Sequence, residues 1–101
     1  MPIHCTHEDR TLTASISGEL DHHAARHLMA ELEEQVDAVH PLRLTLDLAG
    51  LTFTDSSGIA VLLRAWRHMG RLGGTLRVIH TPSQARKVFQ AAALERLITF
   101  E

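Results

Sequence analysis

Cysteine and aromatic residues are the scarcest components of this 101-residue chain. Its single cysteine, Cys5, excludes an internal disulfide and a cysteine-based metal cluster. There is no tyrosine, and the few aromatic residues do not interleave with basic ones, so we expect no direct binding of nucleic acid. No apolar run approaches the length of a membrane span, and the N-terminus lacks the apolar core of a signal peptide. We therefore expect a cytoplasmic protein with no membrane partner.

The composition is that of one small globular domain over residues 1–101. It is 45% hydrophobic and 22% charged, and its length suffices for a single core. The net charge is −2, with a separation of sign: residues 1–50 hold three Arg against nine Asp and Glu, and residues 51–101 hold seven Lys and Arg against three. Such a separation can orient a charged partner, or it can be ordinary solvated charge.

Hydrophobic periodicity divides the chain into alternating strands and helices. Leucines at every second position of residues 42–48 indicate a strand with one buried face. Asp21 is placed to cap a helix, which His40-Pro41 ends, and Gly18 is expected to break the preceding strand. The predicted strands are residues 3–7, 11–17, 42–48, 75–80 and 97–100. The predicted helices are residues 22–39, a second from the serine segment to Arg71, and a third from Pro82 to about Leu94.

This order predicts an α/β fold with a mixed, mostly parallel sheet of four or five strands. Strands separated by helices pair in parallel through right-handed crossovers, and the first two strands, joined by a tight turn, pair antiparallel. A strand that alternates leucine with polar residues is buried on one face, so the helices are expected mainly on one face of the sheet.

The segments GELD (18–21), FTDSSG (53–58) and HTPSQ (80–84) each lead into a helix at one edge of this sheet. Helix N-termini there favour negative charge. Asp55 or Ser56 could simply cap the second helix. The motif DSSGI is neither the GxSxG of a serine hydrolase nor a phosphate-binding loop, so catalysis by these serines is not expected. A hydroxyl followed by Gly58 is unobstructed, and the helix would tolerate a phosphate, so modification is the other interpretation.

GELDHH (18–23) together with FTDSSGIAVLL (53–63) resembles the anti-sigma factor antagonists of Gram-positive bacteria, which are single STAS domains, and the resemblance covers essentially the whole chain. It implies that the second serine, Ser57, is phosphorylated by an anti-sigma factor that is itself a GHKL-type serine kinase. It further implies that a PP2C-type phosphatase removes the phosphate. Partner contacts would lie at Asp21, Asp55, Ser56 and Gly58. The protein would then be a substrate and regulator of transcription by partner switching, not an enzyme, and would need no cofactor.

The same fold also serves other functions, and the alternatives are a STAS subunit of a lipid-transport ABC system or of a stress-sensing scaffold.

Four other features have a plain structural explanation beside a functional one. His23, His27 and Glu31 share an exposed helix face, but three ligands on one straight helix do not converge on a metal, so we expect solvated side chains. The stripe of Arg64, Arg67 and Arg71 is either a secondary contact surface or a solvated face. Cys5 and Trp66 are expected to pack against the core.

Overall fold

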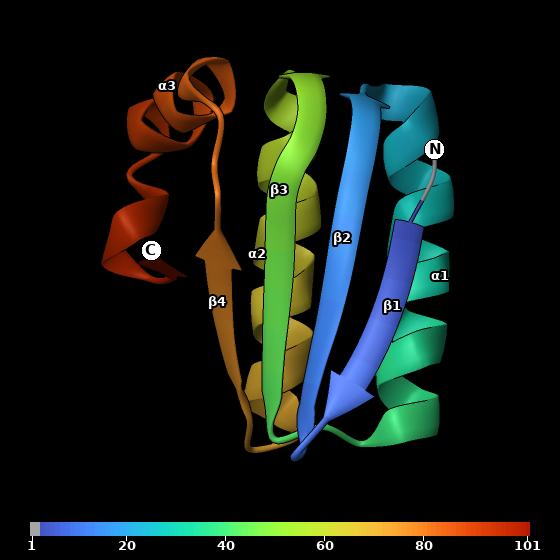
Figure 1. The fold of residues 1–101 in the computed structure, drawn as a ribbon. Coiled ribbons are helices and arrows are strands. Elements are labelled where there is room, and N and C mark those ends of the chain that lie inside the picture. The colour runs from blue at the N-terminus through green and yellow to red at the C-terminus, as the bar shows by residue number, and fades with distance from the viewer. Residues whose placement is uncertain (1–2) are drawn as a thin grey trace.

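The computed structural model of the protein describes residues 3–101 and contains a five-stranded sheet whose strands lie in chain order (Figure 1). The strand β1 (Ile3–Glu8) pairs antiparallel with β2 (Thr11–Leu20). Next come β3 (Arg43–Thr54), β4 (Thr75–Ile79) and β5 (Thr99–Phe100), each parallel to the strand before it. The predicted α/β fold with a mixed, mostly parallel sheet is confirmed.

Three helices connect the strands and lie mainly on one face of the sheet. Both α1 (His22–Val39) and α2 (Ser56–Arg71) lie behind the sheet in Figure 1. The shorter α3 (Ser83–Ala91) lies near the carboxyl end of β4, and a 3₁₀ turn, η1 (Leu94–Arg96), leads to β5. None of the helices formed by residues 3–101 has the length and hydropathy needed to cross a bilayer.

The core lies between this helical layer and the sheet. The strands contribute the inward-facing half of each alternating pattern, as the leucine periodicity predicts. The helices contribute one apolar stripe each. The largest fully buried side chains are Phe89, Leu12, Ile16, Leu20, Leu28, Leu44, Leu46, Leu48, Leu62, Met69, Val36 and Val61. Cys5 and Trp66 are partly buried and pack against this core, as expected.

The prediction that Gly18 breaks the second strand is wrong, because the strand continues to Leu20 through a bulge. Gly18 has a φ of 86°, and the pairing register with β3 shifts on both sides of it. Opposite the bulge, a Cβ on Gly50 would lie 2.8 Å from the Cβ of Ser17, so the close approach of the two strands requires a glycine there. The third strand likewise runs beyond Leu48 to Thr54.

Several smaller boundaries also differ from the sequence prediction. Leu42 lies outside β3 and is 44% exposed, because the strand begins only at Arg43. Pro82 is the N-cap of α3 instead of its first helical residue, and Thr81 makes no cap. The same helix ends at Ala91, since Ala93 turns the chain with a φ of 55°.

Candidate functional site at the carboxyl edge of β2 and β3

The GELD and DSSG motifs meet at one edge of the sheet. Leu20, the last residue of β2, is paired with Thr54, the last residue of β3, so the residues that follow them start from adjacent strands about 5 Å apart. Those next residues are Asp21 and Asp55, each the N-cap of a helix. Figure 1 shows both strands ending at the top of the sheet, beside the starts of α1 and α2.

Both aspartates cap their helices with a side-chain oxygen. Asp21 Oδ1 accepts a hydrogen bond from the backbone N–H of Ala24 at 2.9 Å. Asp55 Oδ1 accepts one from the backbone N–H of Ser57 at 2.8 Å. Of the two residues that the sequence left open as the cap of α2, Asp55 is the one that caps, and Ser56 is the first helical residue.

The two serine hydroxyls therefore have no capping role. Ser56 is exposed and Ser57 is half-buried, and neither hydroxyl is among the side-chain hydrogen bonds of residues 3–101. No histidine is bonded to either serine in this part of the chain, so the hydrogen-bonded base that a serine nucleophile requires is not formed there. Both hydroxyls remain available to a partner or to a modifying enzyme.

Two residues that the sequence analysis missed hold this edge together. The hydroxyl of Thr54 donates to the carbonyl oxygen of Leu20 at 3.1 Å, which links the ends of β2 and β3. The side-chain amide of Gln84, at the start of α3, accepts from the N–H of Thr54 at 3.0 Å and donates to its carbonyl oxygen at 2.8 Å. Nothing local to either residue indicates these bonds, because their partners lie 30 or more positions away.

Gly58 closes the packing under the serines. It is buried in the first turn of α2, and a Cβ at this position would overlap the hydroxyl of Thr54 and lie 3.4 Å from the Phe89 ring. A glycine at position 58 is therefore required by the packing against Thr54 and Phe89.

The surface of the edge is acidic and partly apolar. Glu19, on β2, pairs in register with Phe53 of β3, a residue that is 42% exposed. With Asp21 and Asp55, the edge carries three carboxylates, and no lysine or arginine lies within residues 18–22 or 53–58. A further negative group would meet repulsion from these carboxylates, while the two helix N-termini would partly offset it.

The other candidate site residues considered in the sequence analysis lie along α1 and α2, and of these only His23 is in a helix turn next to this edge. The rings of His23 and His27 contact each other edge to face, with centroids 5.1 Å apart, on the exposed side of α1. Within residues 3–101, no three His, Cys, Asp or Glu side chains are grouped to hold a metal ion. The basic stripe is divided: Arg64 forms a two-point ion pair with Glu33, and Arg67 and Arg71 line a groove.

Comparison with known proteins gives one family. The model of the STAS domain matches residues 3–101. An anti-sigma F factor antagonist of Lysinibacillus sphaericus is 31% identical over 84 residues, which are 83% of this chain and 72% of that protein. The anti-sigma factor antagonist SpoIIAA, solved in its unphosphorylated form, superposes with a TM-score of 0.84 at 25% identity, over 99% of this chain and 88% of that one. The Bacillus cell fate determinant SpoIIAA in its phosphorylated form superposes with a TM-score of 0.75 at 25% identity, over 99% and 91%.

Proposed function

Because the chain belongs to the STAS domain family, and within it to the anti-sigma factor antagonists, we propose that it binds an anti-sigma factor kinase and releases it when Ser57 is phosphorylated. The contact surface is the edge formed by Asp21, Asp55 and Ser56, with the buried Gly58 packed beneath it. The observation that carries the proposal is the meeting of GELD and DSSG on adjacent strands, because a single partner can then cover both motifs.

The physical basis of the switch is the charge of the edge. A phosphate adds nearly two negative charges at pH 7 beside carboxylates that the free protein keeps in water. When a partner covers the edge, these charges lose solvent, so repulsion and desolvation both oppose binding. In the free protein the N-terminus of α2 accommodates the phosphate, so the fold persists while the affinity falls.

The partners follow from the same proposal. The kinase is the anti-sigma factor itself, of the GHKL type, and a PP2C-type phosphatase restores the binding form. The protein is then a substrate and a regulator with no catalysis of its own, acting in the cytoplasm, where ATP is available to the kinase. That the relative SpoIIAA has been solved in unphosphorylated and phosphorylated forms supports this assignment.

The test combines phosphate mapping with three variants. The protein is incubated with ATP and an anti-sigma factor kinase, the phosphate is located by mass spectrometry, and affinity is measured by calorimetry. We expect phosphate on Ser57, none on Ser57→Ala, and persistent binding by that variant. We expect Ser57→Asp to fold normally but bind at least about tenfold more weakly, since a buried charge costs more than about 1.4 kcal/mol.

The matched control is Ser56→Ala, which removes the neighbouring hydroxyl and should still accept phosphate. Phosphate on Ser56, or binding of Ser57→Asp as tight as that of the wild type, would contradict the proposed switch.

A further inference from the structure

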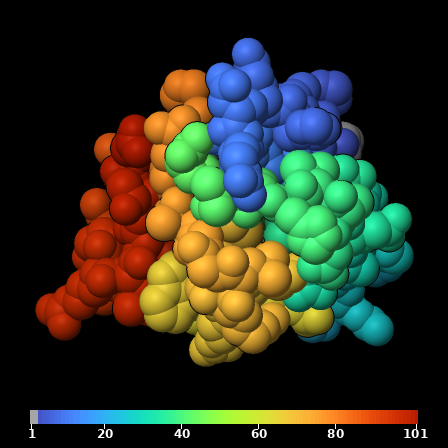
Figure 2. All heavy atoms as spheres, turned by 90° about the horizontal axis from the view of Figure 1, so that it is seen from below, coloured from blue at the N-terminus to red at the C-terminus, as the bar shows by residue number. Residues whose placement is uncertain are grey.

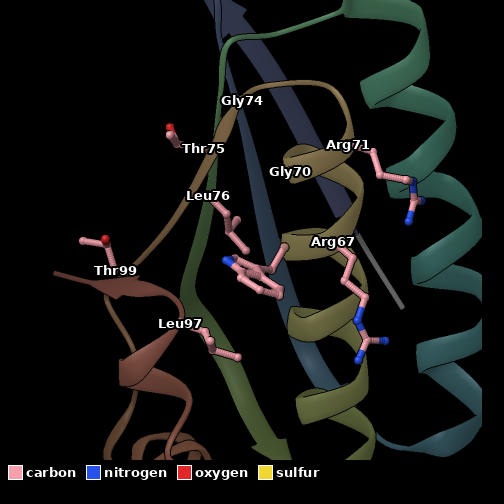
Figure 3. A pocket seen from close by; sticks show the side chains of 9 residues that line it. Arg67, Gly70, Arg71, Gly74, Thr75, Leu76, Leu97 and Thr99 are labelled. Carbon is pink, nitrogen blue, oxygen red and sulfur yellow. The ribbon is translucent and has the colours of Figure 1, made fainter.

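A groove with an apolar floor and a basic rim lies along α2, at the end of the molecule away from Ser57. It has a volume of about 560 Å³ and is enclosed by the last two turns of α2, the start of β4 and the chain around β5. Figure 3 shows Leu76 and Leu97 on the strand side of this groove, with Gly70 on the helix. Seen from below in Figure 2, the C-terminal segment lies on one side of the end of α2 and α1 lies on the other.

The floor and one wall of the groove are apolar. Leu76 is buried at its base, Trp66 is half-buried, and Leu97 is 48% exposed. The apolar surface of the groove is continuous with the hydrophobic core, because Trp66 packs against the core. Covering the groove would therefore remove apolar surface from water, which is the main source of affinity in helix-binding grooves.

The rim on the helix side carries two unpaired positive charges. Arg67 and Arg71 are one turn apart on α2, and neither forms an ion pair or a side-chain hydrogen bond with any group of residues 3–101. In Figure 3 both side chains extend from α2 on the side away from Leu97. Arg64, one turn earlier, differs because Glu33 holds it at 2.8 and 3.1 Å.

The groove also contains a glycine that the chain itself does not require. Gly70 lies within α2, where glycine weakens a helix relative to alanine. A Cβ added at Gly70 would meet no atom within 4 Å, in contrast to Gly58, where the packing excludes a side chain. A bare backbone beside an apolar floor lets another chain approach α2 closely.

From these features we propose that the groove binds an amphipathic helix of a partner protein, one that carries acidic residues along one flank of its apolar stripe. The apolar stripe would cover Trp66 and Leu97, and the acidic flank would pair with Arg67 and Arg71. A second copy of this chain fits less well, because the acidic helix α1 already buries its apolar stripe in its own core. Gly70 lies 13 residues from Ser57, about 20 Å along α2, so this surface is separate from the proposed switch.

The fluorescence of Trp66 tests the proposal directly, because it is the only tryptophan. The probe is a synthetic helical peptide of about 16 residues with leucines on one stripe and glutamates along one flank, and its twin carries lysines in place of the glutamates. We expect the glutamate peptide to shift the emission of Trp66 saturably, and to bind at least about tenfold more tightly than its twin.

Matched variants distinguish binding in the groove from attraction by the net charge of the protein. Arg67→Glu/Arg71→Glu should weaken binding of the glutamate peptide roughly tenfold, and Gly70→Gln should weaken it by occupying the groove. Arg26→Glu/Arg86→Glu makes the same change in net charge on other helices and should leave affinity within about twofold. Thermal unfolding confirms that each variant is folded.

Three results would each overturn the proposal. The first is equal binding of the two peptides, or no saturable change with either. The second is an equal loss of affinity in the two double variants, which would mean that net charge alone attracts the peptide. The third is emission that shifts with protein concentration before peptide is added, which would mean that a second copy of the chain occupies the groove.

Discussion

Replacing Gly58 with alanine tests the packing on which the proposed switch rests. The added methyl would overlap the hydroxyl of Thr54 and lie 3.3 Å from its Cβ. Neither Thr54 nor Phe89, the two residues next to this methyl, can move away easily. The hydroxyl of Thr54 is bonded to the carbonyl of Leu20, its backbone is held by Gln84, and the ring of Phe89 is only 2% exposed. The methyl must therefore displace the hydroxyl or the start of α2.

The expected loss in free energy of unfolding is about 0.5–4.5 kcal/mol, the balance of overpacking, a lost hydrogen bond and a gain in helix propensity. Overpacking a tight site costs roughly 1–3 kcal/mol, and loss of the Thr54–Leu20 hydrogen bond adds about 0.5–1.5 kcal/mol. The better helix propensity of alanine returns at most about 1 kcal/mol. The loss should be visible in urea denaturation followed by circular dichroism as a lower midpoint with an unchanged slope.

Two further variants make the measurement specific. Gly70→Ala makes the same chemical change in the same helix, but into open space, so it should leave stability unchanged or raise it by up to about 1 kcal/mol. Thr54→Ala/Gly58→Ala removes the overlapping hydroxyl, so the double variant should lose at least about 1 kcal/mol less than the sum of the single losses. Additive losses, or a Gly58→Ala protein as stable as the wild type, would refute the reasoning.

Three other predictions address the edge and the lone thiol. Asp21→Ala should lower the free energy of unfolding by about 1 kcal/mol, whereas Asp21→Asn keeps the cap. We expect both variants to be phosphorylated more slowly than the wild type. Normal phosphorylation of Asp21→Asn would restrict the residue to capping. Gln84→Ala should cost about 1–3 kcal/mol in the same urea assay, against almost nothing for the exposed Gln90→Ala. Burial, and secondarily the charge of Glu31, raises the pKa of the Cys5 thiol, so a thiol reagent at about pH 8 should react more slowly with the folded than with the urea-unfolded protein; equal rates would contradict this.

Where a local signal and the tertiary structure agree, the sequence predicts an element to the residue. The first helix has the predicted bounds, His22–Val39, because an aspartate cap opens it and His40-Pro41 closes it. The second helix starts within the serine segment for the same reason, with Asp55 as its cap. The parallel order follows from the alternation of strands and helices, which leaves few topologies open.

Glycine and alanine explain the boundaries that differ. A glycine with positive φ can either end a strand in a turn or sit in a bulge through which the strand continues. Gly18 sits in a bulge, because β2 stays paired with β3 beyond it. The alanines after Ala91 favour helix by propensity, yet the chain turns at Ala93 so that Leu94 and Ile98 are buried. In both places a distant contact outweighs the local preference.

The residues of the candidate site also fall into those that the sequence predicts and those that depend on distant contacts. Asp21 and Asp55 could be brought together from the sequence, because each lies in a loop that follows a predicted parallel strand. Thr54 and Gln84 could not, since the groups they bind are backbone atoms of residues remote in the chain. Phe53 carries no signal of exposure either, because a phenylalanine in a strand usually faces the core.

The bonds that the sequence does not reveal bear on the kind of switch that this edge can form. Thr54 joins the end of β2 to that of β3, Gln84 joins the end of β3 to α3, and Asp55 fixes the first turn of α2. A rearrangement of the serine segment would have to break several of these bonds together, at about 1 kcal/mol or more each. A phosphate at the helix N-terminus gives little reason to break them, because the helix dipole offsets part of its repulsion from the neighbouring carboxylates. We therefore infer that phosphorylation would change the charge of the edge and leave its shape, so that binding is lost by exclusion of the partner and not by refolding of the antagonist.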